Sequence, residues 1–208
     1  GDFYHLYQTG RTLANLRYFK EAQNYLEQTA SAWDGQGEPP PEVNPSLWSH
    51  SLILLSHVTT KLGKFDQAQE ALFALCRARP TYGPGRSHLG RFFYEAGNYV
   101  DAAKQFSKAL AWGCGDKDWG ADPAKNAFIA ASMLAKSLEN TGELQKASAA
   151  WRTAVSLNPQ HPEPYVALAE SYMAGGDKVH AKEFLERAIA LAPAHRRAKN
   201  LYGALEVS

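Results

Sequence analysis

Histidine is the residue type in this chain with the widest chemical potential. Of its seven histidines, His50 and His57 lie seven residues apart and would share one face of a helix, and the repeat described below places His88 on a neighbouring helix. Three imidazoles can hold a zinc ion. Histidines that face solvent in a groove are the simpler interpretation, and we expect neither a metal ion nor a cofactor.

A second candidate is the glycine-rich segment of residues 113–126, which contains Asp116, Asp118 and Asp122. Aspartates at this spacing suggest a calcium loop. A loop of the EF-hand type would need an oxygen ligand where Gly120 stands and a bidentate Glu downstream, so the match fails. We interpret Asp122, which precedes a proline, as the N-cap of a helix.

Motifs of enzymes are missing from the sequence. It contains no phosphate-binding G-x-x-x-x-G-K-[ST], no dinucleotide-binding G-x-G-x-x-G, no zinc-binding H-E-x-x-H and no nucleophile motif G-x-S-x-G. Cys76 falls on an apolar helix face and is most simply a small core residue. These observations favour a binding module that is not an enzyme.

The elements that would position these residues follow from an internal repeat. Five similar segments each end in an alanine, two of the four intervals between these alanines are 34 residues, and the other two are 46 and 45. The chain is therefore a 34-residue repeat with two insertions, at residues 37–48 and 113–126. We call the five positions the framework alanines: Ala22, Ala68, Ala102, Ala147 and Ala181.

The same frame predicts two amphipathic helices in each repeat. A small residue stands twelve positions before each framework alanine and a large apolar residue four positions after it. Small residues let two helices approach closely, and large ones fill the space between neighbours. Glycines between the two halves and prolines after the second half predict the helix ends. We therefore expect an all-α fold. The small residues are Gly10, Ser56, Gly90, Ala135 and Ala169, and the large ones are Leu26, Leu72, Phe106, Trp151 and Leu185.

A 34-residue helix-turn-helix unit with this pattern resembles the tetratricopeptide repeat, over about residues 3–195. The resemblance implies a right-handed α-solenoid closed by a C-terminal capping helix. The first repeat departs from the pattern because it lacks a turn glycine. We expect one domain over residues 1–208, with repeats at about 3–36, 45–82, 83–116, 122–161 and 162–195 and the capping helix at 196–207.

Two segments carry a narrower resemblance. Residues 2–7 and the helix start at residues 123–128 are similar to the tetratricopeptide tails of bacterial family 2 glycosyltransferases. That resemblance implies an accessory region whose catalytic domain lies elsewhere. Residues 116–118 have the D-x-D form of the metal–nucleotide motif of that enzyme class, but no strand precedes them, so we assign no catalysis to this chain.

Composition excludes several classes of protein. The 22 Lys and Arg residues balance 21 Asp and Glu residues, so the net charge is +1 and we expect no nucleic-acid partner. The apolar runs are far shorter than the roughly 20 residues of a membrane helix, so we expect no membrane insertion. Two isolated cysteines and the absence of a signal-peptide pattern favour a cytoplasmic location.

In tetratricopeptide solenoids the first helices of the repeats line a concave groove, so the resemblance places the binding site there. The residues eleven positions before the framework alanines are Arg11, His57, Arg91, Lys136 and Glu170, and four of them are basic or titratable. Such a row predicts charge-assisted hydrogen bonds to an anionic ligand, such as an acidic peptide segment or a carboxylate. The candidate groove residues are Tyr7, Arg11, His57, Lys61, His88, Arg91, Tyr94, Met133, Lys136 and Asn140.

The family's clamp for chaperone C-termini is not reproduced, because its Lys and Asn positions hold Tyr7, Arg11, Leu54, Pro84 and His88 here. The preferred function is a non-enzymatic scaffold that binds a protein or peptide partner in the groove. The alternative is a structural module whose outer helical edges self-associate into a homo-oligomer while the groove binds nothing.

Overall fold

The computed structural model describes residues 2–115 and 122–207, and these contain no β-strand. The all-α prediction is therefore confirmed. No helix within these two ranges combines the length and the hydropathy needed to cross a bilayer. The helices are α1 (Phe3–Asn15), α2 (Phe19–Ala30), α3 (Pro45–Lys61), α4 (Phe65–Ala78), α5 (Gly83–Glu95), α6 (Tyr99–Trp112), α7 (Pro123–Asn140), α8 (Leu144–Leu157), α9 (Glu163–Ala174), α10 (Lys178–Leu191) and α11 (Arg196–Val207).

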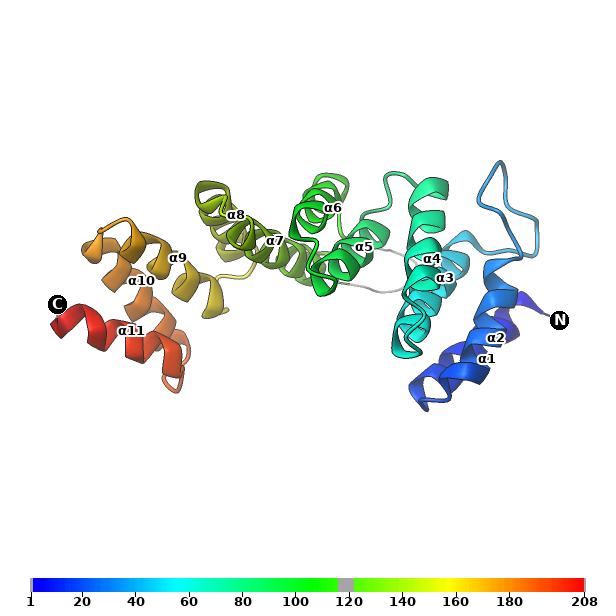
Figure 1. The fold of residues 1–208 in the computed structure, drawn as a ribbon, viewed down its shortest axis with the longest axis horizontal. Helices are drawn as coiled ribbons and strands as arrows, with labels where there is room; N and C mark the ends of the chain where they lie inside the picture. Colours follow the sequence, from blue (N-terminus) through cyan, green and yellow to red (C-terminus); the bar gives the residue numbers. More distant parts are fainter. Residues whose placement is uncertain (1, 116–121, 208) are drawn as a thin grey trace.

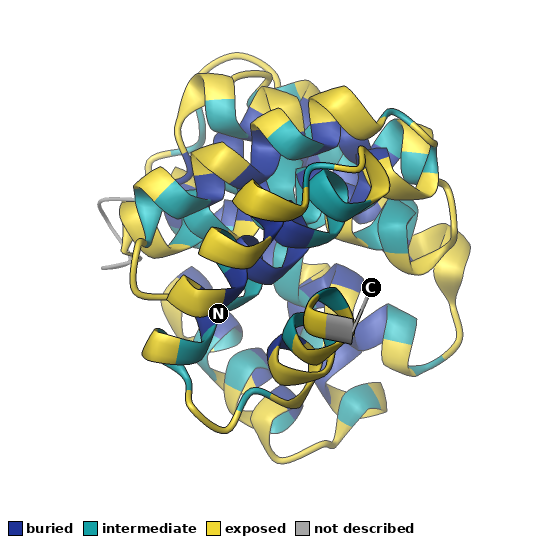
Figure 2. Cartoon of the chain, turned by 90° about the vertical axis from the view of Figure 1, so that its left-hand side faces the viewer, coloured by how far each residue is buried: buried dark blue, intermediate teal, exposed yellow. Residues whose placement is uncertain are grey.

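The helices form five hairpins, α1–α2 to α9–α10, stacked in a row, and α11 packs on the last of them (Figure 1). Each helix contacts the next one along the chain, and the first helices of the first four hairpins also meet, α1 with α3, α3 with α5 and α5 with α7. Seen along the row, buried residues lie where helices face one another and exposed residues cover the outside (Figure 2). This architecture is the predicted α-solenoid.

Close packing within a hairpin depends on the small residue of the first helix. A Cβ added at Gly10 would lie 2.9 Å from Cγ of Leu26, and one added at Gly90 would lie 3.0 Å from Cε1 of Phe106. Leu26 and Phe106, the large residues predicted four positions after the framework alanines, are 0% and 1% exposed. The predicted pairing of small with large residues is confirmed in these hairpins.

The turn within each hairpin needs one residue with left-handed backbone conformation. Gly63, Gly97, Gly142 and Gly176 supply it in four hairpins, with φ between 75° and 80°. In the first hairpin, whose turn lacks a glycine, Arg17 takes this conformation with φ of 66°. A side chain in this region of backbone space costs about 1 kcal/mol, so the first turn is strained relative to the others.

Asn44 and Asp122 are the N-caps of α3 and α7, and for Asp122 this confirms the role predicted above. Each side-chain Oδ1 accepts two backbone N–H groups of the first turn, at 2.9 and 3.0 Å for Asn44 and at 2.9 and 3.2 Å for Asp122. A proline follows each cap at the first helical position, where its missing N–H costs nothing. Because α3 has 17 residues against 13 in α1, the first insertion also lengthens this helix.

The outer face of α11 is polar. Lys199 and Glu206 are exposed, whereas Tyr165 and Tyr172, which stand 34 residues earlier in α9, pack against Phe184 of α10. A stack of hairpins stays soluble when its last helix turns polar residues outward. The α11 helix therefore has the character of the predicted capping helix.

Candidate functional site

A pocket of about 360 Å³ lies between the first helices α1, α3 and α5. Arg11 lines it from α1, Ile53 and Leu54 from α3, and Arg91 and Phe92 from α5. Three consecutive repeats therefore contribute to one site, and its lining combines apolar side chains with cationic ones. We call this site the α1–α3–α5 pocket.

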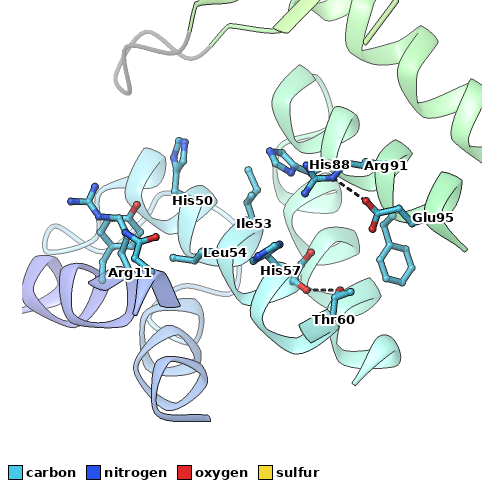
Figure 3. A pocket seen from close by; sticks show the side chains of 13 residues that line it. Arg11, His50, Ile53, Leu54, His57, Thr60, His88, Arg91 and Glu95 are labelled. Carbon is cyan, nitrogen blue, oxygen red and sulfur yellow. Dashed lines mark hydrogen bonds and ion pairs between the residues drawn. The ribbon is translucent and has the colours of Figure 1, made fainter. Parts of the chain in front are cut away.

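Three lining residues hold the same place in successive repeats. Arg11, His57 and Arg91 each stand eleven positions before a framework alanine, and the stacking of α1, α3 and α5 brings them into one pocket. Figure 3 shows Arg11 on one side, His88 and Arg91 on the other, and His57 between them. The repeat thus aligns the predicted row over these three helices.

The two arginines of the pocket have different neighbours. The guanidinium of Arg11 lies over the ring of Tyr7, 5.8 Å from its centroid, and burial raises the pKa of this phenol. Nε of Arg91 lies 3.6 Å from Oε1 of Glu95, and both side chains are about half exposed. Among the described residues that line the pocket, Glu95 alone is acidic. The lining therefore carries more positive than negative charge.

His57 and His88 are neutral at pH 7. Burial, followed by the charges of Arg91, His50 and His57, lowers the pKa of His88 to about 4. Burial also lowers the pKa of His57, and the neighbouring Lys61 and Arg91 act in the same direction. An anion placed beside these imidazoles would raise both pKa values, because it favours the protonated forms.

A smaller pocket of about 170 Å³ lies between α5 and α7. His88 and Arg91 line both pockets, so the two adjoin at these side chains. Beyond them the smaller pocket is mainly apolar, with Phe106 from α6 and Ile129 and Met133 from α7. We call it the α5–α7 pocket.

Six of the ten predicted groove residues line these pockets, and four do not. Lys61 is exposed at the end of α3. Tyr94 packs against Tyr99 of α6, with ring centroids 5.2 Å apart. Lys136 is half-buried on α7, and Nδ2 of Asn140 donates to its carbonyl oxygen at 2.8 Å. The six lining residues are Tyr7, Arg11, His57, His88, Arg91 and Met133.

The acidic end of the predicted row belongs to the capping contact. Glu170 accepts Nε of Arg197 at 2.8 Å, and Nη1 of the same arginine lies 3.4 Å from Glu163. Arg197 is a residue of α11, so the capping helix neutralises the fifth position of the row. The residues that line the two pockets belong to the first four hairpins.

Sequence reasoning missed the apolar and acidic members of the α1–α3–α5 pocket. Ile53 stands four residues before His57, and Glu95 stands four residues after Arg91. Residues four apart on a helix share a face. A search one turn to either side of each row position would have found both.

The described residues contain no group of three or more His, Cys, Asp or Glu side chains able to hold a metal ion. His50, His57 and His88 line the same pocket but do not form such a group. Asp116 and Asp118, the other residues considered for metal binding, lie outside the described ranges.

Family profiles described as tetratricopeptide repeat match residues 60–122 and 138–205, which together are more than half of the chain. The chain belongs to the tetratricopeptide repeat family. Among solved structures, YrrB, titled "a TPR protein with an unusual peptide-binding site", is similar with a TM-score of 0.69 and 15% identity, over 94% of this chain and 89% of that chain.

MamA is similar as well. One MamA structure has a TM-score of 0.70 and 16% identity over 91% of both chains. MamA from Desulfovibrio magneticus RS-1 has a TM-score of 0.69 and 18% identity, over 94% of this chain and 98% of that one. At these identities the likeness concerns the fold alone.

A curated relative is much longer than this chain. Cellulose synthase operon protein C of Pseudomonas fluorescens (strain SBW25) is 24% identical over 206 aligned residues, which cover 84% of this chain and 16% of that protein. The chain therefore spans a small part of the length of this relative.

Proposed function

We propose that the chain is a non-enzymatic interaction scaffold that binds a segment of a partner protein along the α1–α3–α5 pocket. The observation that carries the proposal is the convergence of Arg11, His57 and Arg91 from equivalent positions of three repeats. Apolar Ile53 and Phe92 lie among these polar groups. A concave site with apolar walls and a few polar side chains is typical of ligand binding.

Site-specific photocross-linking tests the proposal. A benzophenone amino acid replaces Phe92, which lines the pocket, or Phe65, which is 59% exposed on α4 and lines neither pocket. We expect a partner to be captured from Phe92 and not from Phe65. Binding of the purified partner should weaken about tenfold in Arg91→Glu, which corresponds to about 1.4 kcal/mol. Capture from Phe65 alone would contradict a groove ligand.

We further propose that the chain is the accessory region of a larger protein associated with a glycosyltransferase. Support comes from the relative named for a cellulose synthase operon, of which the chain spans 16%. Both cysteines are buried free thiols, which suits a reducing cytoplasmic location. The five hairpins would be its repeats within the predicted boundaries. Affinity purification of the full gene product tests this association, and recovery without any glycosyltransferase would contradict it.

Self-association is a second candidate, favoured by exposed apolar side chains at the start of the second helices. Phe65, Val100, Leu144 and Val179 are 59%, 54%, 51% and 70% exposed, and each stands two or three residues before a framework alanine. Exposed apolar residues repeated along an edge can bind another protein surface. Light scattering at increasing concentration tests this candidate: a monomer throughout would contradict it, and a dimer lost in Phe65→Ser with Leu144→Ser would support it.

A further inference from the structure

The two adjoining pockets differ in chemistry. In the α1–α3–α5 pocket, Arg11 and His57 accompany Arg91, whereas in the α5–α7 pocket the neighbours of Arg91 are Ile129 and Met133. Ile129 is 47% exposed although its side chain is large and apolar. A ligand that lies across the boundary would therefore meet a cationic region on one side and an apolar region on the other.

The charges around this boundary come from three helices. On the α1 side stands Arg11, on α3 stand His50 and His57, and on α5 Arg91 and Glu95 flank His88. The described residues of α7 that line the smaller pocket include no titratable side chain. Among the described residues that line the larger pocket, Glu95 is the one acidic residue against two arginines, and it lies beside Arg91. A further carboxylate would complement this charge, and arginine binds carboxylates through charge-assisted hydrogen bonds.

We propose that the boundary binds an extended peptide segment in which an Asp or Glu stands beside a large aliphatic residue, with the carboxylate at His88 and Arg91 and the aliphatic side chain in the α5–α7 pocket. This inference rests on the proposed function and specifies its ligand. The smaller pocket, at about 170 Å³, is of the size for a single side chain. Arg91, exposed over half of its side chain, can turn from Glu95 to a ligand.

Binding of a carboxylate at this place has a consequence for pH. His88 is neutral in the free chain, with a pKa of about 4 because it is buried and faces Arg91, His50 and His57. A bound carboxylate favours the imidazolium, so the pKa of His88 is higher in the complex than in the free chain. Binding therefore takes up a proton, and the affinity rises as the pH falls from about 7.5 to about 5.5.

Selection from a random heptapeptide library displayed on phage tests the ligand class. The library is selected on the intact chain and, separately, on Arg91→Gln and Met133→Ala. We expect the intact chain to enrich peptides that carry an acidic residue beside Leu, Ile or Met. Arg91→Gln should lose the acidic preference and keep the aliphatic one, and Met133→Ala should do the reverse. Circular dichroism confirms that each variant is folded.

The best peptide is then measured by fluorescence anisotropy. We expect binding to weaken about tenfold in Arg91→Gln, and equally when the acidic residue of the peptide becomes its amide. Arg77→Gln, an exposed arginine on α4 outside both pockets, is the matched control and should bind as the unchanged chain does. The gain in affinity at low pH should be smaller in His88→Asn than in the unchanged chain, with His57 accounting for the remainder.

Three outcomes would overturn the inference. Enrichment of aliphatic peptides without acidic residues would refute binding of a carboxylate but would not contradict the proposed function of the groove. Capture of a partner at Phe92 without any enriched peptide would indicate that the ligand is a folded partner domain. This outcome refutes the peptide ligand and is consistent with the groove function. Absence of cross-links at Phe92 refutes the groove function and this inference together.

Discussion

Replacing Gly90 by leucine should force α5 away from α6. A Cβ at this position already lies 3.0 Å from one ring atom of Phe106 and 3.1 Å from two others, before the rest of a leucine side chain is added. Phe106 is 1% exposed, so its ring is largely enclosed by the surrounding side chains. Gly203 provides the matched control, because it stands 34 residues after Ala169 at the equivalent position of α11 and nothing lies within 4 Å of its added Cβ.

The two substitutions should change stability in opposite directions. Overfilling a packed core costs about 1–3 kcal/mol, and a leucine against an aromatic ring belongs at the upper end of that range. Removing a glycine from a helix interior gains back about 1 kcal/mol. We therefore expect Gly90→Leu to lower the free energy of unfolding by about 2 kcal/mol and Gly203→Leu to raise it by about 0.5–1 kcal/mol.

Thermal unfolding followed by far-ultraviolet circular dichroism measures the difference. For a chain of this length, 1 kcal/mol shifts the midpoint by about 2–4 °C, so the two variants should differ by about 5–12 °C. Adding Phe106→Ala should cost less in the Gly90→Leu background than in the unchanged chain, because the two side chains compete for one space. Equal midpoints for the two leucine variants would refute this account of the packing.

Three further predictions concern the turns, the caps and the half-buried His88. Arg17→Gly should stabilise the chain by about 0.5–1 kcal/mol because it relieves the left-handed backbone at φ of 66°, whereas Gly63→Ala should destabilise it; urea midpoints compare the two. Asn44→Ala should cost about 1 kcal/mol in the same assay, through loss of two hydrogen bonds at the start of α3. The pKa of His88 in the folded chain is about 4, below its usual 6.5, so the unfolded chain binds a proton here more readily than the folded one. The free energy of unfolding should therefore fall as the pH falls from 6.5 towards 4, by at most about 3 kcal/mol. In His88→Asn the fall over the same pH range should be smaller.

Most of the fold could be predicted because each sequence signal for a helix, a turn or a packing contact recurs in several repeats. Local signals, whose physical effect does not depend on distant residues, mark most of the elements. They are the small and large residues at fixed distances from the framework alanines, the turn glycines, and the caps at Asn44 and Asp122. Arg17 could not be placed in the same way. Its unusual backbone conformation is imposed by the packing of α1 on α2, which holds the turn in one shape whichever residue occupies it.

The candidate site was predictable only where it follows the repeat. Arg11, His57 and Arg91 share a repeat position, so the stacking of α1, α3 and α5 brings them together. Lys136 shares that position too, yet it lines neither pocket. The α5–α7 pocket is lined by Phe106, Ile129 and Met133, which come together because of the way α7 packs against α5 and α6. The sequence pattern of a single repeat does not predict this packing.

The stacking of hairpins in a row also determines how the chain would carry mechanical load. Each hairpin is held mainly by the helices before and after it along the chain, so a force applied to the two ends acts on these contacts in series. Hairpins would yield one at a time, and each 34-residue repeat would release about 12 nm of extended chain. Before any hairpin opens, small changes of angle between neighbours would lengthen the row, and the protein would behave as a soft spring between whatever its two ends are attached to.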